Sequence, residues 1–529
     1  MGNGTLKKNL AFVVSAVLIG LTAAGAAATE LQDVLAKHLR ALGDRDSLVA
    51  IKSAAAFSTI DYVGMSGKAV SYVKFPVQYY ARVELSVLSQ EKGFDGLTAW
   101  TRDHSGITRR DIAEELKPMI NELYFESFSY LLPDRNPGTT VYQGDTLIGG
   151  NMYHRLALYA AGGDSLFLFI NAQSGLAEYR FEIITGLPMK TVYEDFRKVR
   201  GVLMPFSMRS ETPGAPYEMS VWNDSVWINP DLPDSIFLMP GTSAVDYRFP
   251  QGADSIVIPF ELIGNSLRVR VNINGKGPFS FLLDSGSGTT MISDRAADSL
   301  EIGVGGDIPV RGVGGFGTIG MARLDSLTIG QLFWGLTRVS VFDFKNLETL
   351  SLSTLDGILG YDFFARFPMR VNFDERTLTL FDSRKAMPEK PGEKIAADIF
   401  YQIPITDVQL DGKPLRVGFD LGAQAGVVIR RQSRWYVEMA EAIDSLAEKH
   451  SVGGIGGMKQ VKAFRADSLR IGALTIMDPS VMVFGDDSAL PLPDYVEGLL
   501  GVDILNQFNL FIDYGEGKVY LDPRRAPDK

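Results

Sequence analysis

The second half of the chain contains a long internal repeat, and such self-similarity means that one supersecondary unit is built twice. Four blocks occur in the same order in both copies. They are 281–287 (FLLDSGS) and 417–423 (VGFDLGA), 313–317 (VGGFG) and 452–457 (VGGIGG), 325–330 (DSLTIG) and 467–472 (DSLRIG), and 357–363 (GILGYDF) and 498–504 (GLLGVDI). The offset stays nearly constant, from 136 for the first block (420 − 284) to 141 for the last (498 − 357). The repeat therefore predicts two homologous lobes of roughly 135–140 residues each.

The first block reads as a buried strand that enters a tight turn at Asp284, where Gly286 permits positive φ or a close backbone approach. A lone aspartate there most simply caps its own turn. Two copies alter that interpretation, because pseudo-twofold packing brings equivalent turns together and makes Asp284 face Asp420. Close carboxylates share one proton, and such a pair can hold a water, deprotonate it and protonate a leaving group.

These blocks resemble the aspartic peptidases. Segment 281–287 fits their catalytic turn, and the glycine-rich segments 313–320 and 452–457 resemble the flaps of the retroviral-type enzymes. Segments 358–360 and 499–501 resemble the apolar-apolar-Gly element that packs beneath that turn. The resemblance implies a mostly β chain whose C-terminal half is a two-lobed, aspartic-protease-like pair of β-barrel domains, with Asp284 and Asp420 as the catalytic pair.

The resemblance also implies roles for neighbouring residues. Support of the catalytic turns falls to Ser285, Gly286, Ser287, Leu421 and Gly422. Substrate contact by the flaps falls to Val313, Gly314, Gly315, Phe316, Val452, Gly453, Gly454 and Ile455.

Leu421 departs from the family pattern. The family places Thr or Ser after each aspartate, and its hydroxyl cross-links the two turns. Ser285 fits that role and Leu421 does not; Ala423 matters less, since Ala occurs there in retroviral-type turns. On this pattern a weakened aspartate pair, a substrate-restricted peptidase and a pseudoenzyme that only binds all stay open.

Several residues have simpler interpretations. The glycine-rich segments are not phosphate cradles, because no Lys-Ser/Thr pair follows them, and a flexible hairpin over a cleft fits better. Asp362 and Asp503 are expected to be helix caps rather than catalytic groups. Trp334 and Trp435 belong to the core or to the cleft wall.

The N-terminal half shows a different pattern. Apolar residues at helical spacing over 31–39 give way after Ala54 to short alternating strands, with a further helix expected around 111–131. This predicts an α+β domain with a curved antiparallel sheet. Its strand–turn–strand segments resemble the periplasmic lipoprotein carriers, whose half-open barrel holds acyl chains; these segments are 93–100, 169–176 and 196–206. The resemblance implies a lipid or apolar ligand, and a β-rich scaffold with a filled core is the alternative.

The first 28 residues are typical of a secretory signal. Lys7 and Lys8 precede an apolar stretch over 10–21, and small residues end at Ala28, where cleavage is expected. A membrane anchor is the alternative. We therefore expect a periplasmic or secreted protein. Its expected domains are the signal peptide at 1–28, the carrier-like domain at 29–245, the first protease lobe at 246–388 and the second at 389–529.

Composition narrows the chemistry. The chain has no cysteine, which excludes disulfides, thiol catalysis and Cys-ligated zinc, and its four histidines form no metal motif. A formal net charge of −11 argues against nucleic acid as a partner. We expect no cofactor and no metal site. The predicted function is an envelope aspartic endopeptidase that acts on peptide or protein, as a monomer since both half-sites lie in one chain. The alternative is a non-catalytic lipid- or peptide-binding envelope protein with a degenerate protease-like domain.

Overall fold

The structure, a computed structural model, describes residues 29–524 except 87, 185–186, 215, 242–244, 346, 349–352, 401, 447, 455, 485–491 and 493–494. The expected signal peptide and Ile455 of the second flap lie outside the described residues. Within the described part, no helix is long and apolar enough to cross a membrane.

The N-terminal half is a thirteen-stranded sheet in which every neighbouring pair is antiparallel. Its strands are β1 (Ser53–Tyr62), β2 (Met65–Lys74), β3 (Gln78–Leu85), β4 (Ser89–Phe94), β5 (Ala99–Arg102), β6 (Thr108–Arg110), β7 (Gly138–Ile148), β8 (Asn151–Ala160), β9 (Ser165–Asn171), β10 (Ala177–Ile184), β11 (Leu187–Val199), β12 (Val202–Glu211) and β13 (Glu218–Ile228). Its helices are residues 29–42, α2 (Arg45–Ala50), α3 (Ala113–Glu126) and the short η1 (Asp234–Ile236).

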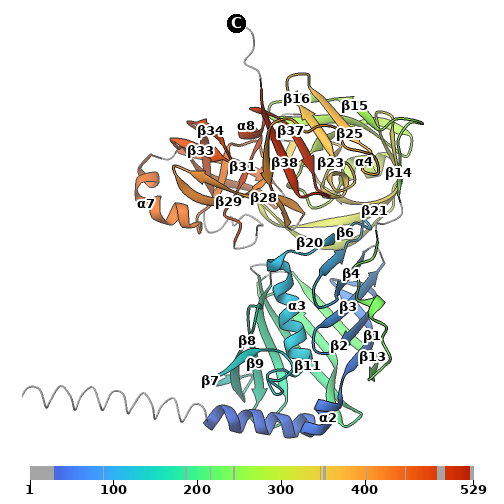
Figure 1. The fold of residues 1–529 in the computed structure, drawn as a ribbon, viewed down its shortest axis with the longest axis vertical. Helices are drawn as coiled ribbons and strands as arrows, with labels where there is room; N and C mark the ends of the chain where they lie inside the picture. Colours follow the sequence, from blue (N-terminus) through green and yellow to red (C-terminus); the bar gives the residue numbers. More distant parts are fainter. Residues whose placement is uncertain are drawn as a thin grey trace, which may run out of the picture.

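The helices cover one face of this sheet because alternate strand residues are apolar on that side. Leu166, Leu168 and Ile170 of β9 are fully buried, as a period of two requires. The helix 29–42 adds Val34 to the same cluster, and α3 adds Tyr124. Figure 1 shows α3 lying along the sheet. The predicted curved antiparallel sheet with accompanying helices is confirmed.

The first lobe is built on a nine-stranded sheet. It comprises β14 (Tyr247–Arg248), β16 (Glu261–Ile263), β17 (Ser266–Ile273), β18 (Lys276–Leu283), β19 (Met291–Ser293), β20 (Val304–Gly312), β21 (Gly315–Ile329), β22 (Leu332–Phe342) and β23 (Gly357–Leu359), with α4 (Asp294–Ser299) and α6 (Tyr361–Phe364).

The second lobe repeats this plan on a ten-stranded sheet. It comprises β27 (Asp398–Phe400), β28 (Ile403–Leu410), β29 (Lys413–Phe419), β30 (Val427–Arg430), β31 (Glu448–Gly454), β32 (Gly457–Arg465), β33 (Ser468–Ile471), β34 (Leu474–Met477), β35 (Ser480–Phe484) and β36 (Gly498–Leu500), with α7 (Arg434–Leu446) and α8 (Val502–Leu505).

A six-stranded sheet joins the lobes. Its strands are β15 (Ser255–Pro259), β24 (Met369–Asn372), β25 (Thr377–Phe381), β26 (Glu393–Ala396), β37 (Phe508–Asp513) and β38 (Lys518–Pro523). At its centre Met369 pairs with Ile512 and Val371 with Leu510. With the repeat offset of 141 (498 − 357), this pairing is symmetric, since 512 corresponds to 371 and 510 to 369. The repeat therefore packs about a local twofold axis, and the predicted two-lobed architecture is confirmed.

One continuous apolar core runs through both lobes. Trp334 and Trp435 are both buried in it, which settles their role as core residues. Each indole also donates a hydrogen bond, Trp334 to Asp246 at 3.3 Å and Trp435 to the Leu410 carbonyl at 3.0 Å.

Polar and apolar contacts join the N-terminal sheet to the first lobe, and Figure 1 shows β6 close to β20 at this junction. Arg366, after α6, donates to the Ser105 carbonyl of the β5–β6 loop at 2.7 Å and forms an ion pair with Asp246. Met65 of β2 joins an apolar cluster with Ile308 and Ile319 of the β20–β21 hairpin. The fold thus places the N-terminal half against the first lobe and its hairpin, and Ile112 before α3 also packs on Ile405 and Val496 of the second lobe.

Candidate functional site

The two aspartates occupy equivalent positions in the two lobes. β18 runs parallel to β23, and the Asp284 N–H donates to the Leu359 carbonyl at 3.0 Å. β29 runs parallel to β36, and the Asp420 N–H donates to the Leu500 carbonyl at 2.9 Å. Each aspartate therefore leaves its sheet at the strand end, held by the apolar-apolar-Gly element that the sequence indicated.

The glycines of the two turns show that the carboxyl groups face each other across the lobes. A Cβ placed on Gly286 would lie 2.6 Å from the Asp420 carboxyl oxygens. A Cβ on Gly422 would lie 2.3 Å from Cγ and Oδ1 of Asp284. Neither glycine has a positive φ. Glycine is therefore required at both positions by a close approach and not by a positive φ. The approaching group is the aspartate of the opposite lobe.

Burial dominates the electrostatics of this pair. It raises the pKa of Asp284 well above its ordinary value, and the charge of Asp420 raises that pKa further. Burial also raises the pKa of Asp420. Backbone N–H groups oppose the effect, since Gly286 donates to Asp284 at 2.9 Å and Gly422 donates to Asp420 at 2.8 Å. The pair consequently favours a state in which the two carboxyls hold a proton between them.

Ser285 joins the two turns. Its hydroxyl accepts a hydrogen bond from the Leu421 N–H at 2.9 Å and donates one to the Phe419 carbonyl at 2.9 Å. The Leu421 side chain, at the equivalent position, is 1% exposed and belongs to the shared core. One hydroxyl thus makes two bonds across the junction, while the residue opposite contributes its backbone and its apolar side chain.

The support elements hold the outer part of each turn in the same way. The Tyr361 N–H donates to the Ser287 carbonyl at 2.9 Å, and the Val502 N–H donates to the Ala423 carbonyl at 2.9 Å. Ser287 also donates through its hydroxyl to the Thr289 carbonyl at 2.8 Å.

The expectation that Asp362 and Asp503 cap helices is wrong. The N-cap positions of α6 and α8 are Gly360 and Gly501, so each aspartate lies inside its helix. Asp362 is buried and accepts from the N–H and the hydroxyl of Thr290, at 2.8 and 2.6 Å. Asp503 accepts from the side chain of Asn265 in the other lobe. Both carboxylates tie the support element to its surroundings.

The glycine-rich segments form hairpins whose tips meet. A Cβ on Gly314 would lie 2.2 Å from the Gly457 nitrogen, and one on Gly456 would lie 2.5 Å from the Gly315 backbone. The two hairpins are β20–β21 and β31–β32, in which Gly453 and Gly454 lie opposite Met458 and Gly457.

The predicted flap side chains separate into two groups. Val313 and Val452 pack on an apolar cluster of the second lobe that includes Val428 and Leu499. Phe316 instead contacts Tyr217 of the N-terminal half, with ring centroids 5.7 Å apart.

Tyr514 is a residue that sequence reasoning missed. Its hydroxyl lies 3.5 Å from the Ser285 carbonyl, to which it donates, and its ring centroid is 5.7 Å from that of Tyr361. Burial raises its pKa well above the ordinary value, so the phenol stays neutral beneath the turn. The repeat puts Phe373 at the corresponding place (514 − 141), and this Phe-to-Tyr difference was the available signal.

No group of three or more His, Asp or Glu side chains that could hold a metal ion occurs among residues 29–524 where they are described. The described part of the site consists of carboxyl, hydroxyl and backbone groups.

Residues 269–363 and 406–504 match a family model described as aspartyl protease. The two matched segments contain Asp284 and Asp420 respectively. No curated protein matches the chain.

Three solved structures resemble parts of the chain. An aspartic proteinase from Irpex lacteus has 12% identity and a TM-score of 0.34, covering 51% of this chain and 97% of its own. A LolA superfamily protein from Nitrosomonas europaea has 12% identity and a TM-score of 0.28, covering 39% and 96%. A DUF1329 family protein from Desulfovibrio piger has 12% identity and a TM-score of 0.28, covering 39% and 97%.

Proposed function

We propose that this chain is an aspartic endopeptidase of the bacterial envelope, in which Asp284 and Asp420 activate a water for attack on a peptide bond. One observation carries the proposal: Gly286 and Gly422 each lie against the aspartate of the opposite lobe, so two carboxyl groups meet at the lobe junction. A turn that served folding alone would not need two carboxylates brought together at the cost of their burial.

The chemistry follows from a pair that holds one proton. The ionised carboxylate accepts a proton from the water as the water oxygen attacks the peptide carbonyl carbon. The protonated carboxyl donates its proton to the carbonyl oxygen, which gives a neutral tetrahedral intermediate. The carboxyl that took the water proton then donates it to the amine nitrogen as the C–N bond breaks. The other carboxylate accepts a hydroxyl proton from the intermediate, which releases the carboxylic acid and restores the one-proton pair. The raised pKa values of both aspartates support this starting state, because one carboxyl stays protonated above the ordinary aspartate range.

The flap hairpins suit an extended peptide as substrate. Their tips are glycine-rich, so backbone N–H and C=O groups are free of covering side chains and can pair with a substrate strand. Val313 and Val452 would add apolar contacts on either side. The mechanism uses protein side chains and water, and the proposal includes no cofactor.

The remaining proposals concern location and assembly. A signal peptide over 1–28 would deliver the mature chain to the periplasm, and the domains would divide near 245 and 388. One chain supplies both turns, so the active unit would be a monomer, with a lipid or apolar molecule as a ligand of the N-terminal sheet.

The test is cleavage of a complex peptide library by purified protein spanning residues 29–529, at acidic and neutral pH, with and without a statine-type transition-state mimic. We expect cuts at internal bonds that the mimic suppresses. If no peptide is cleaved at any pH, and no signal responds to the mimic, the peptidase is excluded.

A second candidate is a binding protein without turnover. Leu421 in place of a hydroxyl residue favours it. Tight binding of the statine-type mimic by a chain that cleaves nothing in the library would support this candidate.

A further inference from the structure

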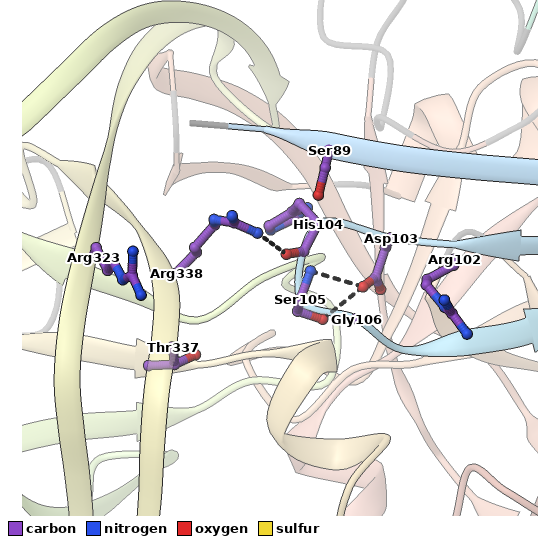
Figure 2. Close-up of a pocket in the computed structure, with 9 residues that line it drawn as sticks. All are labelled: Ser89, Arg102, Asp103, His104, Ser105, Gly106, Arg323, Thr337 and Arg338. Atoms are coloured by element: carbon purple, nitrogen blue, oxygen red, sulfur yellow. Dashed lines mark hydrogen bonds between the residues drawn. The ribbon is translucent and has the colours of Figure 1, made fainter. Parts of the chain in front are cut away.

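A cavity of about 240 Å³ lies between the N-terminal sheet and the first lobe, and none of its lining residues belongs to the aspartate turns. Figure 2 shows the residues that line it. The N-terminal half contributes Ser89 at the start of β4 and the loop 103–106 between β5 and β6. The first lobe contributes Arg323 on β21 and Thr337 and Arg338 on β22.

Two arginines oppose each other at this cavity. Arg323 and Arg338 are directly opposite in the β21–β22 ladder, and both are exposed. Like charges in that position destabilise a sheet unless something neutralises them. Within the described part of the chain Arg323 has neither an ion pair nor a hydrogen bond, and Arg338 donates to the His104 carbonyl at 3.0 Å. The described residues thus leave two guanidinium groups without a carboxylate.

The other charged groups of the lining are already engaged. Asp103 accepts hydrogen bonds through Oδ1 from the Ser105 N–H and hydroxyl and from the Ile107 N–H. Arg102, at the edge of the cavity, donates to the Thr108 hydroxyl at 2.9 Å and lies 3.8 Å from Glu91. The donors to Asp103 are neutral, so its carboxylate offsets one positive charge, and with Arg323 and Arg338 the cavity keeps a net positive charge.

Two buried polar atoms at the same cavity also lack partners. Thr337 is 2% exposed, and its Oγ1 has no hydrogen-bond partner among the described residues. Nε2 of His104 is buried and is likewise unpartnered there. Buried polar atoms are almost always satisfied in folded proteins. Both atoms are covered in this structure, so each side chain has to rotate toward the cavity before its hydroxyl or imidazole nitrogen can donate to an anion there.

We infer that this cavity binds a small oxyanion of the phosphate class, held by Arg323 and Arg338 and completed by Thr337 and His104. Guanidinium forks match the oxygens of phosphate in paired hydrogen bonds. Two forks and two further donors suit an anion with several oxygens, and the cavity volume admits a phosphate group with its neighbouring atoms.

The bound anion would also join the two halves of the chain. β21 carries Arg323 in the same strand as the flap residues Gly315 and Phe316. The loop 103–106 belongs to the N-terminal half. This binding site stands independently of peptidase activity.

The experiment measures thermal unfolding of the full mature chain in chloride buffer and in inorganic phosphate at equal ionic strength, so that general screening cancels. We expect phosphate to raise the melting temperature with saturation. Arg323→Gln and Arg338→Gln should each weaken phosphate binding, measured by calorimetry, by about tenfold or more. Lys276→Gln, which removes an exposed charge elsewhere on the first lobe, should bind phosphate as the wild type does.

In chloride alone, Arg323→Gln should melt at or above the wild-type temperature, because a like-charge pair is gone. This shows that lost phosphate binding is not misfolding. A second arm uses vesicles with and without phosphatidic acid. Arginine-dependent binding to phosphatidic acid vesicles without binding of inorganic phosphate would assign the phosphate to a lipid headgroup and support the site. Phosphate binding that is equal in the wild type and in the double variant, or an absence of binding in both arms, would overturn the inference.

Discussion

The two aspartate turns have nearly the same backbone geometry and different surroundings. Ser285 follows the first aspartate and bonds across the junction, whereas Leu421 follows the second and is buried in the core. The glycine-rich hairpins, which we propose as flaps, differ as well. Phe316 beside the first tip contacts the ring of Tyr217 in the N-terminal half and is 41% exposed, and Met458 beside the second tip is 46% exposed.

This contrast teaches which parts of the site must be symmetric. Acid–base chemistry by a carboxyl pair needs both aspartates in equivalent positions, and both glycines must allow the approach. The hydrogen bonds between the two turns come from one side only, through the Ser285 hydroxyl. Ser285 supplies a donor and an acceptor, which satisfies the backbone of the opposite turn and leaves the other position free for an apolar side chain.

The largest expected effect comes from removing either carboxylate. Asp284→Asn and Asp420→Asn should each reduce peptidase turnover by about 10²–10⁴-fold, because the pair then lacks its base or its acid. The measurement is kcat on a cleaved library peptide. Asp325→Asn and Asp467→Asn, exposed aspartates of another repeated block, are the matched controls. A larger loss of kcat in one Asn variant than in the other would show that the two turns are not functionally equivalent. Full turnover in either Asn variant would show that the pair is not catalytic.

The next effect tests the approach of the carboxyls through the glycines. Gly286→Ala and Gly422→Ala place a Cβ at 2.6 and 2.3 Å from the opposite aspartate, which forces the pair apart. A displacement of about 1 Å can cost roughly 10²-fold in rate. We expect both variants to lose activity, with Gly422→Ala the worse. Gly303→Ala, where a Cβ meets nothing within 4 Å, is the control. Normal kcat in Gly422→Ala would mean that the lobes are spaced differently in solution.

The two hydrogen bonds of the Ser285 hydroxyl across the junction predict a stability difference of a few kcal/mol. Ser285→Ala leaves the Leu421 N–H unpaired in the junction, at a cost of about 1–3 kcal/mol. Leu421→Thr should also destabilise by about 1–3 kcal/mol, because it removes buried apolar atoms and adds a hydroxyl. Denaturant unfolding measures both, with Ser326→Ala as control. A stabilised Leu421→Thr variant would show that a hydroxyl on the second turn can also form a hydrogen bond across the junction.

The sequence alone predicted those parts of the site that belong to the internal repeat. The four blocks predicted two lobes and their order because a duplicated motif is visible without any knowledge of contacts. The contact of Phe316 with Tyr217 and the placement of Tyr514 under Ser285 join positions that share no local pattern. The same holds for Asp362, whose partner Thr290 is 72 positions away. Local patterns carry strand periodicity and turn chemistry, and long-range packing decides the rest.

The raised pKa of Asp284 predicts a pH dependence of stability. Its folded pKa lies above its unfolded value, so its contribution is fully present below about pH 4, the ordinary aspartate range, and is lost as pH rises through the folded pKa. Asp284→Asn should therefore gain stability relative to wild type as pH rises. Asp382 is the contrasting control, because Arg384 lowers its pKa and its contribution is lost as pH falls. Melting temperatures from acid to neutral pH measure both differences. If the difference in melting temperature between Asp284→Asn and the wild type does not change with pH, the burial of this pair is contradicted. Peptidase turnover should decline with rising pH over the same range.

The smallest effect concerns the flaps. Tyr217→Ala removes the aromatic contact that holds Phe316, and such pairs are worth about 0.5–1.5 kcal/mol beyond their area. The first hairpin should then open more readily, which raises KM for a peptide substrate more than it lowers kcat. Met458→Ala, at the exposed tip of the second hairpin, should leave the melting temperature nearly unchanged because little packing is lost there. Equal effects of the two variants on melting and on KM would show that the N-terminal half does not restrain the first flap. A loss confined to Tyr217→Ala would show that the two lobes, though alike at their aspartates, close over substrate from unequally anchored hairpins.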